Sequence, residues 1–237
     1  MPQIAAHHQP KSPRLRQLKW ITLALGLACA LTVSAGLTDF SSKLLNAVSR
    51  KWGTPAYQRL LAWQEVVQEQ KPKAENQWTS SNNSATLNTL KITNAFFNRI
   101  PYYSDQTHWG TEDYWATPIE MLGSNGGDCE DYAAGKYFSL RELGAPVGQL
   151  RMVYVRALRR NEAHMVLAWY PTPEAEPLIL DNLIGDIKPA SQRTDLEPVY
   201  SFNDDDIWTG NTQRKGSASQ IRFWRELKEK MAREQAM

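Results

Sequence analysis

Cysteine is scarce in this sequence, with only two residues, Cys29 and Cys129, among 237. Cys29 lies inside an apolar N-terminal stretch, so Cys129 is the only thiol in the rest of the chain. A single thiol forms no disulfide within one chain, which excludes a disulfide-stapled fold. A lone cysteine is either a small buried apolar residue or a reactive thiol. The residues around Cys129 decide between these two interpretations.

Charge of one sign is also lacking, because 27 Lys and Arg residues stand against 25 Asp and Glu residues, a net charge of +2. Such a balance gives no strong electrostatic field, so nucleic acid is not expected as a partner. Histidine is rare as well, and beyond the N-terminal region only His108 and His164 are candidates for a catalytic base. The length fits one globular domain without internal repeats.

Residues 1–38 have the pattern of an export leader. An apolar stretch runs from Trp20 to Leu37, and four basic residues precede it: Lys11, Arg14, Arg16 and Lys19. Val33-Ser34-Ala35 offers the small residues that a signal peptidase requires, and the stretch is also long enough for a single membrane anchor. Both alternatives stay open, and either one places the domain of residues 39–237 outside the cytoplasm.

Helical spacing of apolar residues dominates the first half of the chain, and short β-type runs dominate the second half. The order of helices before consecutive antiparallel strands predicts an α+β fold. Residues 101–127 are expected to form ordered loops, in which Trp109 and Trp115 either line a groove or close over the core. The chain after Asp186 is expected to be loop-like, including Asp204-Asp205-Asp206, up to a closing helix. The expected helices are 44–52, a helix from Pro55 through Val67, one from Asn83 or Ser84 to Phe97, 133–143 and 221–231, and the expected strands are 150–158, 163–170 and 178–183.

Cys129 lies where a glycine-rich loop, Gly126-Gly127-Asp128, enters a helix. Free backbone N–H groups and the helix dipole at such a position favour a thiolate, and the Cys129 amide is a candidate oxyanion-hole donor. A thiolate of this kind needs an imidazole, and His164 opens a strand that fixes its ring. The next strand carries Asp181 among apolar residues, where a carboxylate needs a partner. Cys129, His164 and Asp181 are therefore predicted as nucleophile, base and orienting group of a thiol-dependent acyl-transfer enzyme.

Three motifs resemble those of the bacterial transglutaminase-like cysteine proteinases: Gly127-Asp128-Cys129-Glu130-Asp131-Tyr132, Ala163-His164-Met165-Val166-Leu167 and Leu180-Asp181-Asn182-Leu183. The resemblance is clearest from Tyr102 to Asp186. It implies a papain-like core, in which a helical half bearing Cys129 packs on an antiparallel sheet bearing the other two residues.

The resemblance also implies a substrate, a partner and a compartment. Family members cut the N-terminal region of a very large surface adhesin at a paired-alanine site, which releases the adhesin and disperses the biofilm. The periplasmic domain of an inner-membrane receptor that senses cyclic di-GMP binds them and holds them inactive. The expected location is therefore the periplasm, with the leader either removed or retained as an inner-membrane anchor.

Calcium is a further expectation of the resemblance. The matching acidic positions are Asp128 and Glu130, which flank the nucleophile, with Asp131 as an additional candidate. Carboxylate oxygens suit calcium, which takes roughly six to eight oxygen ligands. Without the resemblance, Asp128 is a helix cap and Glu130 a first-turn carboxylate that the helix dipole favours.

Other functions fit the same residues. A transglutaminase uses the same triad but passes the acyl group to an amine instead of water, and a peptidoglycan hydrolase shares the thiol and the compartment. A non-catalytic module that only grips a peptide is a third alternative, which the intact Cys129, His164 and Asp181 disfavour.

Overall fold

The computed structural model describes residues 36–74, 78, 84–210 and 213–237 of the chain. Most of the predicted leader lies outside these residues, and the boundary after residue 38 stays a prediction. Among the helices that the structure describes, none has both the length and the apolar character needed to cross a membrane.

Helices form most of the first half of the described chain, as the sequence predicts, and one further helix closes it. The predicted helices that begin near 44, 55, 84 and 221 are confirmed. Ser41 starts the first of them by accepting a hydrogen bond from the Leu44 N–H at 3.0 Å, an N-cap that satisfies one free donor. The α-helices are α1 (Ser42–Trp52), α2 (Thr54–Ala74), α3 (Ser84–Phe97), α4 (Asp105–His108), α5 (Pro118–Ser124), α6 (Cys129–Glu142) and α7 (Arg222–Gln235).

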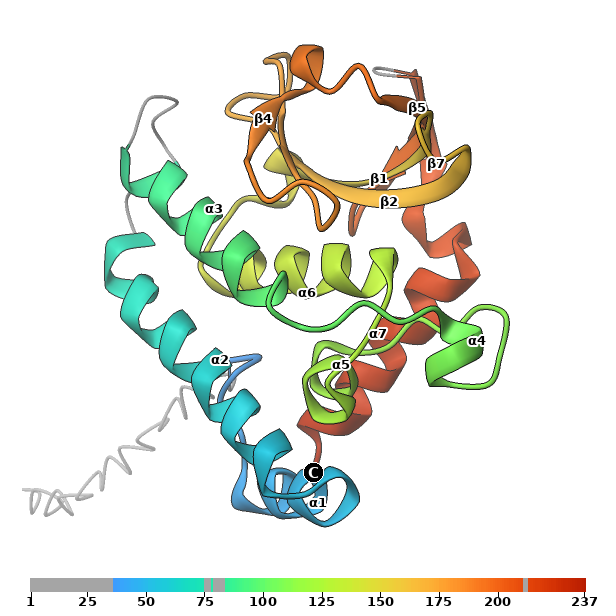
Figure 1. The fold of residues 1–237 in the computed structure, drawn as a ribbon. Helices are drawn as coiled ribbons and strands as arrows, with labels where there is room; N and C mark the ends of the chain where they lie inside the picture. The colour runs from blue at the N-terminus through green and yellow to red at the C-terminus, as the bar shows by residue number, and fades with distance from the viewer. Residues whose placement is uncertain (1–35, 75–77, 79–83, 211–212) are drawn as a thin grey trace, which may run out of the picture. The chain divides into compact units, whose positions relative to one another are not determined.

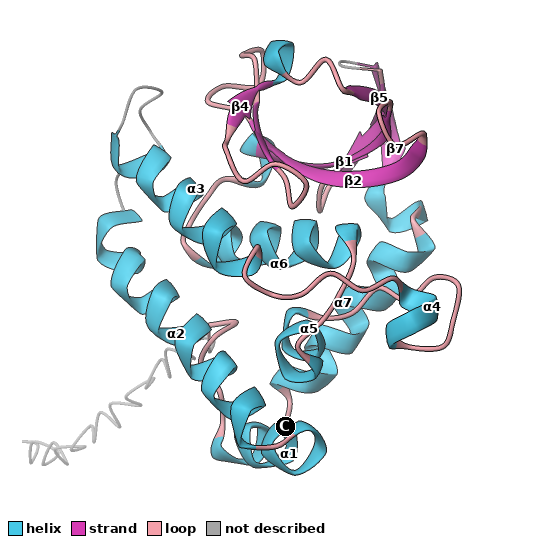
Figure 2. Cartoon of the chain, in the orientation of Figure 1, coloured by secondary structure: helices cyan, strands magenta, loops and turns pink. Residues whose placement is uncertain are grey.

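An antiparallel sheet of seven strands follows in the described part of the chain, in the order β4-β3-β2-β1-β5-β6-β7. Figure 2 shows that this sheet is strongly curved. The predicted strands at 150, 163 and 178 are confirmed as its β1, β2 and β3. Together with the helices they confirm the α+β fold. The strands are β1 (Leu150–Ala157), β2 (Glu162–Trp169), β3 (Leu178–Leu180), β4 (Lys188–Pro189), β5 (Leu196–Phe202), β6 (Asp206–Thr209) and β7 (Gln213–Ser217).

Two local expectations were wrong. The chain after Asp186 is not loop-like, because it contributes β4 to β7. Residues 101–127 include α5, which begins where Thr117 accepts a hydrogen bond from the Glu120 N–H and Pro118 takes the first helical position. The residues expected to be helical from 133 lie within α6, which begins at Cys129, the helix start that the glycine-rich loop predicts; Asp131 stabilises this start by accepting the Asp128 N–H.

The main core joins α6 to the sheet on one side and to residues of α1, α2, α3, α5 and α7 elsewhere, and α6 lies next to the sheet (Figure 1). α6 packs against β1 and β2, which supply alternate apolar side chains to this face. On its other sides α6 contacts α3 and α5. Gly135 allows the approach to α3, because a Cβ there would lie 2.4 Å from Cε1 of Phe97. The helix that carries Cys129 is therefore held from several directions.

The face of the sheet that points away from α6 is also apolar. The sheet is strongly curved, so the apolar side chains on this inner face pack against one another (Figure 1). A register shift between β1 and β5 at Tyr154 and Val155 has the geometry of a β-bulge, which increases the bend of a strand. This second cluster contains Val153, Val155, Val166, Ala168 and Ile179.

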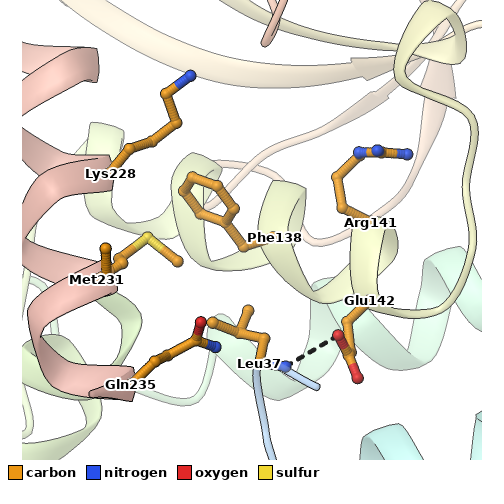
Figure 3. Close-up of a pocket in the computed structure, with 8 residues that line it drawn as sticks. Leu37, Phe138, Arg141, Glu142, Lys228, Met231 and Gln235 are labelled. Atoms are coloured by element: carbon orange, nitrogen blue, oxygen red, sulfur yellow. Dashed lines mark hydrogen bonds between the residues drawn. The ribbon is translucent and has the colours of Figure 1, made fainter. Parts of the chain in front are cut away.

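The far end of α6 meets both ends of the described chain (Figure 3). The Leu37 N–H donates to Oε2 of Glu142, the last residue of α6, at 3.0 Å. Leu37, Glu142 and Gln235 of α7 line one pocket. Residues 36–38 therefore pack as part of the folded body, and the side chain of Thr38 is buried.

Candidate active site

Cys129 is the first residue of α6 and its thiol is half-buried. The preceding loop approaches its neighbours closely at Gly126 and Gly127. A Cβ on Gly127 would lie 2.7 Å from Oδ2 of Asp131, and one on Gly126 would lie 2.6 Å from Cε1 of His108. Only glycine fits such contacts without a shift of the neighbours, so these two residues fix how the loop enters the helix.

His164 and Asp181 are in direct contact, as the sequence predicts. Nε2 of His164 lies 2.8 Å from Oδ1 of Asp181, and both side chains are buried. His164 lies on β2, and Asp181 directly follows β3, the strand that pairs with β2. The contact occupies Nε2, so Nδ1 is the ring nitrogen that remains for another partner.

The backbone of β2 connects this pair to Cys129. The Met165 N–H, next in sequence to His164, donates a hydrogen bond to the Cys129 sulfur. The structure thus places Cys129 of α6 beside the strand that carries His164, and His164 in contact with Asp181. His108 is not part of this group, because its Nε2 contacts the Ser124 hydroxyl at 2.8 Å and its ring stacks on Tyr103.

Asp181 has partners that the sequence did not reveal. Burial raises the pKa of Asp181, but hydrogen bonds from His164, Leu183 and Arg193 outweigh it and lower the pKa to about 2. The Arg193 contact joins Nη2 to Oδ2 of Asp181 at 2.7 Å. A partner for this carboxylate was expected, but no local pattern marks Arg193 as that partner.

Acidic side chains gather beside Cys129. Asp105, Asp128 and Asp131 offer carboxylate oxygens within 4.8 Å of one another, and so do Asp105, Asp113 and Glu130. Asp105 and Asp113 were not predicted, since they lie in the segment expected to be loops. Burial raises the pKa of Asp105 to about 6, and burial together with Glu130 raises that of Asp128 to about 10.

The thiol is affected by the same carboxylates. Its sulfur donates to Oε2 of Glu130 at 3.1 Å. Burial, Glu130 and Asp128 raise the pKa of Cys129 well above its ordinary value. Negative charge beside a nucleophilic thiolate is unfavourable, and a bound cation would offset it.

The carboxylates fit a calcium ion. Oδ1 of Asp105 and Oδ1 of Asp128 are buried and have no hydrogen-bond partner among the described residues. Oxygen atoms of this kind are the ligands that calcium prefers. Asp131 differs from them, because its oxygens accept the Ala116 N–H at 2.7 Å and the Asp128 N–H at 3.3 Å.

Trp115, one of the two tryptophans expected either in a groove or over the core, belongs to the core. Its ring is buried and stacks on Phe223 at a centroid distance of 6.0 Å. Trp109 packs on Tyr114 at 4.6 Å.

Comparison with known proteins agrees with this geometry. The family described as bacterial transglutaminase-like cysteine proteinase matches residues 61–210, which include Cys129, His164 and Asp181. The chain belongs to this family. Cysteine proteinases use a thiol, and Cys129, at the start of α6, is a free cysteine.

Solved structures support the same assignment. LapG of Legionella pneumophila is 37% identical, with a TM-score of 0.66, over 80% of this chain and 94% of that chain. An EGTA-treated form matches with 37% identity and a TM-score of 0.67, over 80% of this chain and 96% of that one. A calcium-bound form matches with 38% identity and a TM-score of 0.65, over 81% and 99%. No curated protein matches the chain.

Proposed function

We propose that this protein is a calcium-dependent periplasmic cysteine endopeptidase that cleaves the N-terminal region of a large surface adhesin at a paired-alanine site. Release of the adhesin would promote dispersal of the biofilm. The observation that carries the proposal is the buried contact between His164 and Asp181, next to Met165, whose backbone N–H donates to the Cys129 sulfur. Family membership and the likeness to Legionella LapG support it.

Each residue has one role in this mechanism. The Cys129 thiolate attacks the carbonyl carbon of the scissile peptide, and the Cys129 backbone N–H stabilises the oxyanion that forms. His164 takes the thiol proton at Nδ1 and gives it to the leaving amine, while Asp181 holds Nε2 and stabilises the imidazolium. Water, deprotonated by His164, then hydrolyses the thioester and restores the thiol.

Calcium would be held by Asp128 and Glu130, the two positions expected from the sequence, with Asp105 as an added ligand and Asp131 as a further candidate. When bound, the ion supplies positive charge that offsets the carboxylates around the thiol. The chain's own contribution is to hold these oxygens beside the first turn of α6. Calcium-bound and EGTA-treated forms of Legionella LapG support a calcium requirement.

Regulation is part of the same proposal. The periplasmic domain of an inner-membrane receptor that senses cyclic di-GMP would bind the protease and keep it from the adhesin. Adding the purified domain to the cleavage reaction tests this step. We expect cleavage to stop at a molar excess of the domain, and undiminished cleavage would contradict the regulation without affecting the protease assignment.

Cleavage of a purified adhesin N-terminal fragment tests the function. Wild-type protein and Cys129→Ala are compared in calcium and in EGTA, and a fragment whose paired alanines are replaced is the matched substrate control. We expect cleavage only by wild type, only in calcium and only of the unmodified fragment. Cleavage that persists in EGTA would remove calcium from the proposal.

A labelled primary amine in the same reaction separates hydrolysis from acyl transfer. Incorporation of the label without chain cleavage would replace the protease by a transglutaminase. If Cys129→Ala releases the adhesin as wild type does, the protein acts without the thiol and the binding-module alternative holds.

A further inference from the structure

The carboxylate of Asp181 has a different partner at each oxygen. Oδ1 contacts Nε2 of His164 at 2.8 Å and accepts the Leu183 N–H at 3.0 Å. Oδ2 accepts a hydrogen bond from Nη2 of Arg193 at 2.7 Å. The imidazole and the guanidinium therefore hold one carboxylate through its two different oxygens.

Arg193 is itself held in place. It follows the 3₁₀ helix η3 (Ala190–Gln192), and its side chain is only 1% exposed. Nε and Nη2 of its guanidinium donate to the two oxygens of Asp195 at 3.0 and 2.9 Å. The planar fork of arginine suits such a two-oxygen contact, so Asp195 fixes the orientation in which Arg193 meets Asp181.

Because Asp181 is buried, its carboxylate depends on the partners that His164 and Arg193 provide. The side chain of Asp181 is 0% exposed, and a buried carboxylate stays ionised only with charged or hydrogen-bonded partners. Rotation about the last torsion of an aspartate is broad, so contacts at Oδ1 alone would leave Oδ2 without a partner and the carboxylate less firmly oriented. Other groups around Asp181 are Lys136 of α6, whose buried ammonium attracts it electrostatically, and Asn98, which donates to its backbone carbonyl at 2.8 Å.

We propose that Arg193 is a positioning residue of the active site, which clamps Oδ2 of Asp181 so that Oδ1 keeps the His164 ring in its productive orientation. This inference rests on the proposed proteolytic function, and it deepens that function by adding a fourth residue to the site. Arg193 does not touch substrate. It acts through Asp181 and His164.

The first experiment needs no substrate. The ring N–H of His164 is observed by NMR in wild type, Arg193→Gln and Arg156→Gln. Arg156 is the matched control, because it lies in an exposed ion pair with Glu197 on the same sheet. We expect a protected Nε2–H resonance in wild type and in the control, and its broadening or loss in Arg193→Gln. An unchanged resonance in a folded Arg193→Gln protein would overturn the inference.

The second experiment uses the adhesin fragment and calcium-loaded protein. We expect Arg193→Gln to lower kcat roughly 10- to 100-fold with KM within about twofold of wild type, because misorientation of a catalytic group affects the chemical step. Added to Asp181→Asn, Arg193→Gln should lower kcat no further, since both changes act through one contact. Losses that multiply would show that Arg193 acts elsewhere and would overturn the proposal.

Asp195→Asn keeps the inference testable if Arg193→Gln does not fold. This change weakens the outer anchor of the guanidinium and leaves the contact to Asp181 available, so we expect a smaller kcat loss and a weaker ring resonance. Wild-type values for both would overturn the inference. If wild type itself fails to cleave the fragment, the proposed function fails, while the NMR comparison still decides the role of Arg193.

Discussion

Asp131 provides the sharpest test of how the helix start is built. Its buried carboxylate accepts the Ala116 N–H and the Asp128 N–H, so it joins the loop before α5 to the first turn of α6. Asp131→Ala removes both acceptors. Loss of a helix cap costs about 1 kcal/mol, and a buried donor left without a partner costs about 1–3 kcal/mol. We therefore expect the free energy of unfolding to fall by about 2–4 kcal/mol.

Electrostatic relief works against that loss, and Asp131→Asn controls for it. Burial and Glu130 raise the pKa of Asp131 well above its ordinary value, so keeping this carboxyl group in the acidic cluster costs stability at neutral pH, and removing it removes that cost. Asparagine removes the same charge but keeps one acceptor oxygen. The difference between the two variants therefore measures the hydrogen bonds, and we expect Asp131→Ala to be less stable by about 1 kcal/mol or more.

Urea unfolding in EGTA, followed by tryptophan fluorescence, measures both variants without the metal. A loss of about 2–4 kcal/mol corresponds to a fall in Tm of about 4–16 °C for a body of this size. If both variants match wild type in EGTA and differ from it only in calcium, Asp131 acts solely as a metal ligand. That result would refute the cap argument.

Three further predictions concern charge and packing. Glu130→Gln should weaken calcium binding by roughly tenfold or more, because losing a residue that only supports a metal ligand already costs about that much affinity. A calcium Kd that calorimetry finds unchanged would exclude Glu130 as a ligand. Burial raises the pKa of Glu234 from its usual 4.5 to about 7, so the folded state holds an extra proton and stability falls as the pH rises between these values. As the pH rises through this range, the urea midpoint of unfolding should fall more steeply in wild type than in Glu234→Gln. Midpoints that depend on pH in the same way in both proteins would contradict the raised pKa of Glu234. Gly135→Ala should cost about 1–3 kcal/mol, because its Cβ meets Phe97, whereas Gly148→Ala, with open space around its Cβ, should unfold as wild type does.

Periodicity in the sequence predicted the elements that bury a regular apolar face. β1 and β2 were predictable because their residues are mostly buried and apolar, and α7 because Trp224, Leu227 and Met231 recur on one face. β7 was not predictable, since four of its five residues are exposed and polar and show no alternation. An edge strand of this kind is defined by pairing with its neighbour, which local sequence does not encode.

The same limit applies to the site. Cys129, His164 and Asp181 stand out locally, as a thiol at a helix start, an imidazole at a strand start and a carboxylate among apolar residues. Arg193 and Asp105 do not stand out, because each lies in a polar segment where a charged residue is ordinary. Their burial beside the site depends on how β4 and α4 pack, which is a tertiary property.

The orientation of α6 also has a practical consequence for handling the enzyme. Its 14 residues extend about 20 Å from Cys129 to Glu142. Leu37 and Gln235 line a pocket at the Glu142 end (Figure 3). A tag, fusion partner or surface tether joined after Gln235 is therefore attached near the Glu142 end of α6, which is the end far from the Cys129 thiol. A macromolecular substrate can then reach an immobilised enzyme from the free side.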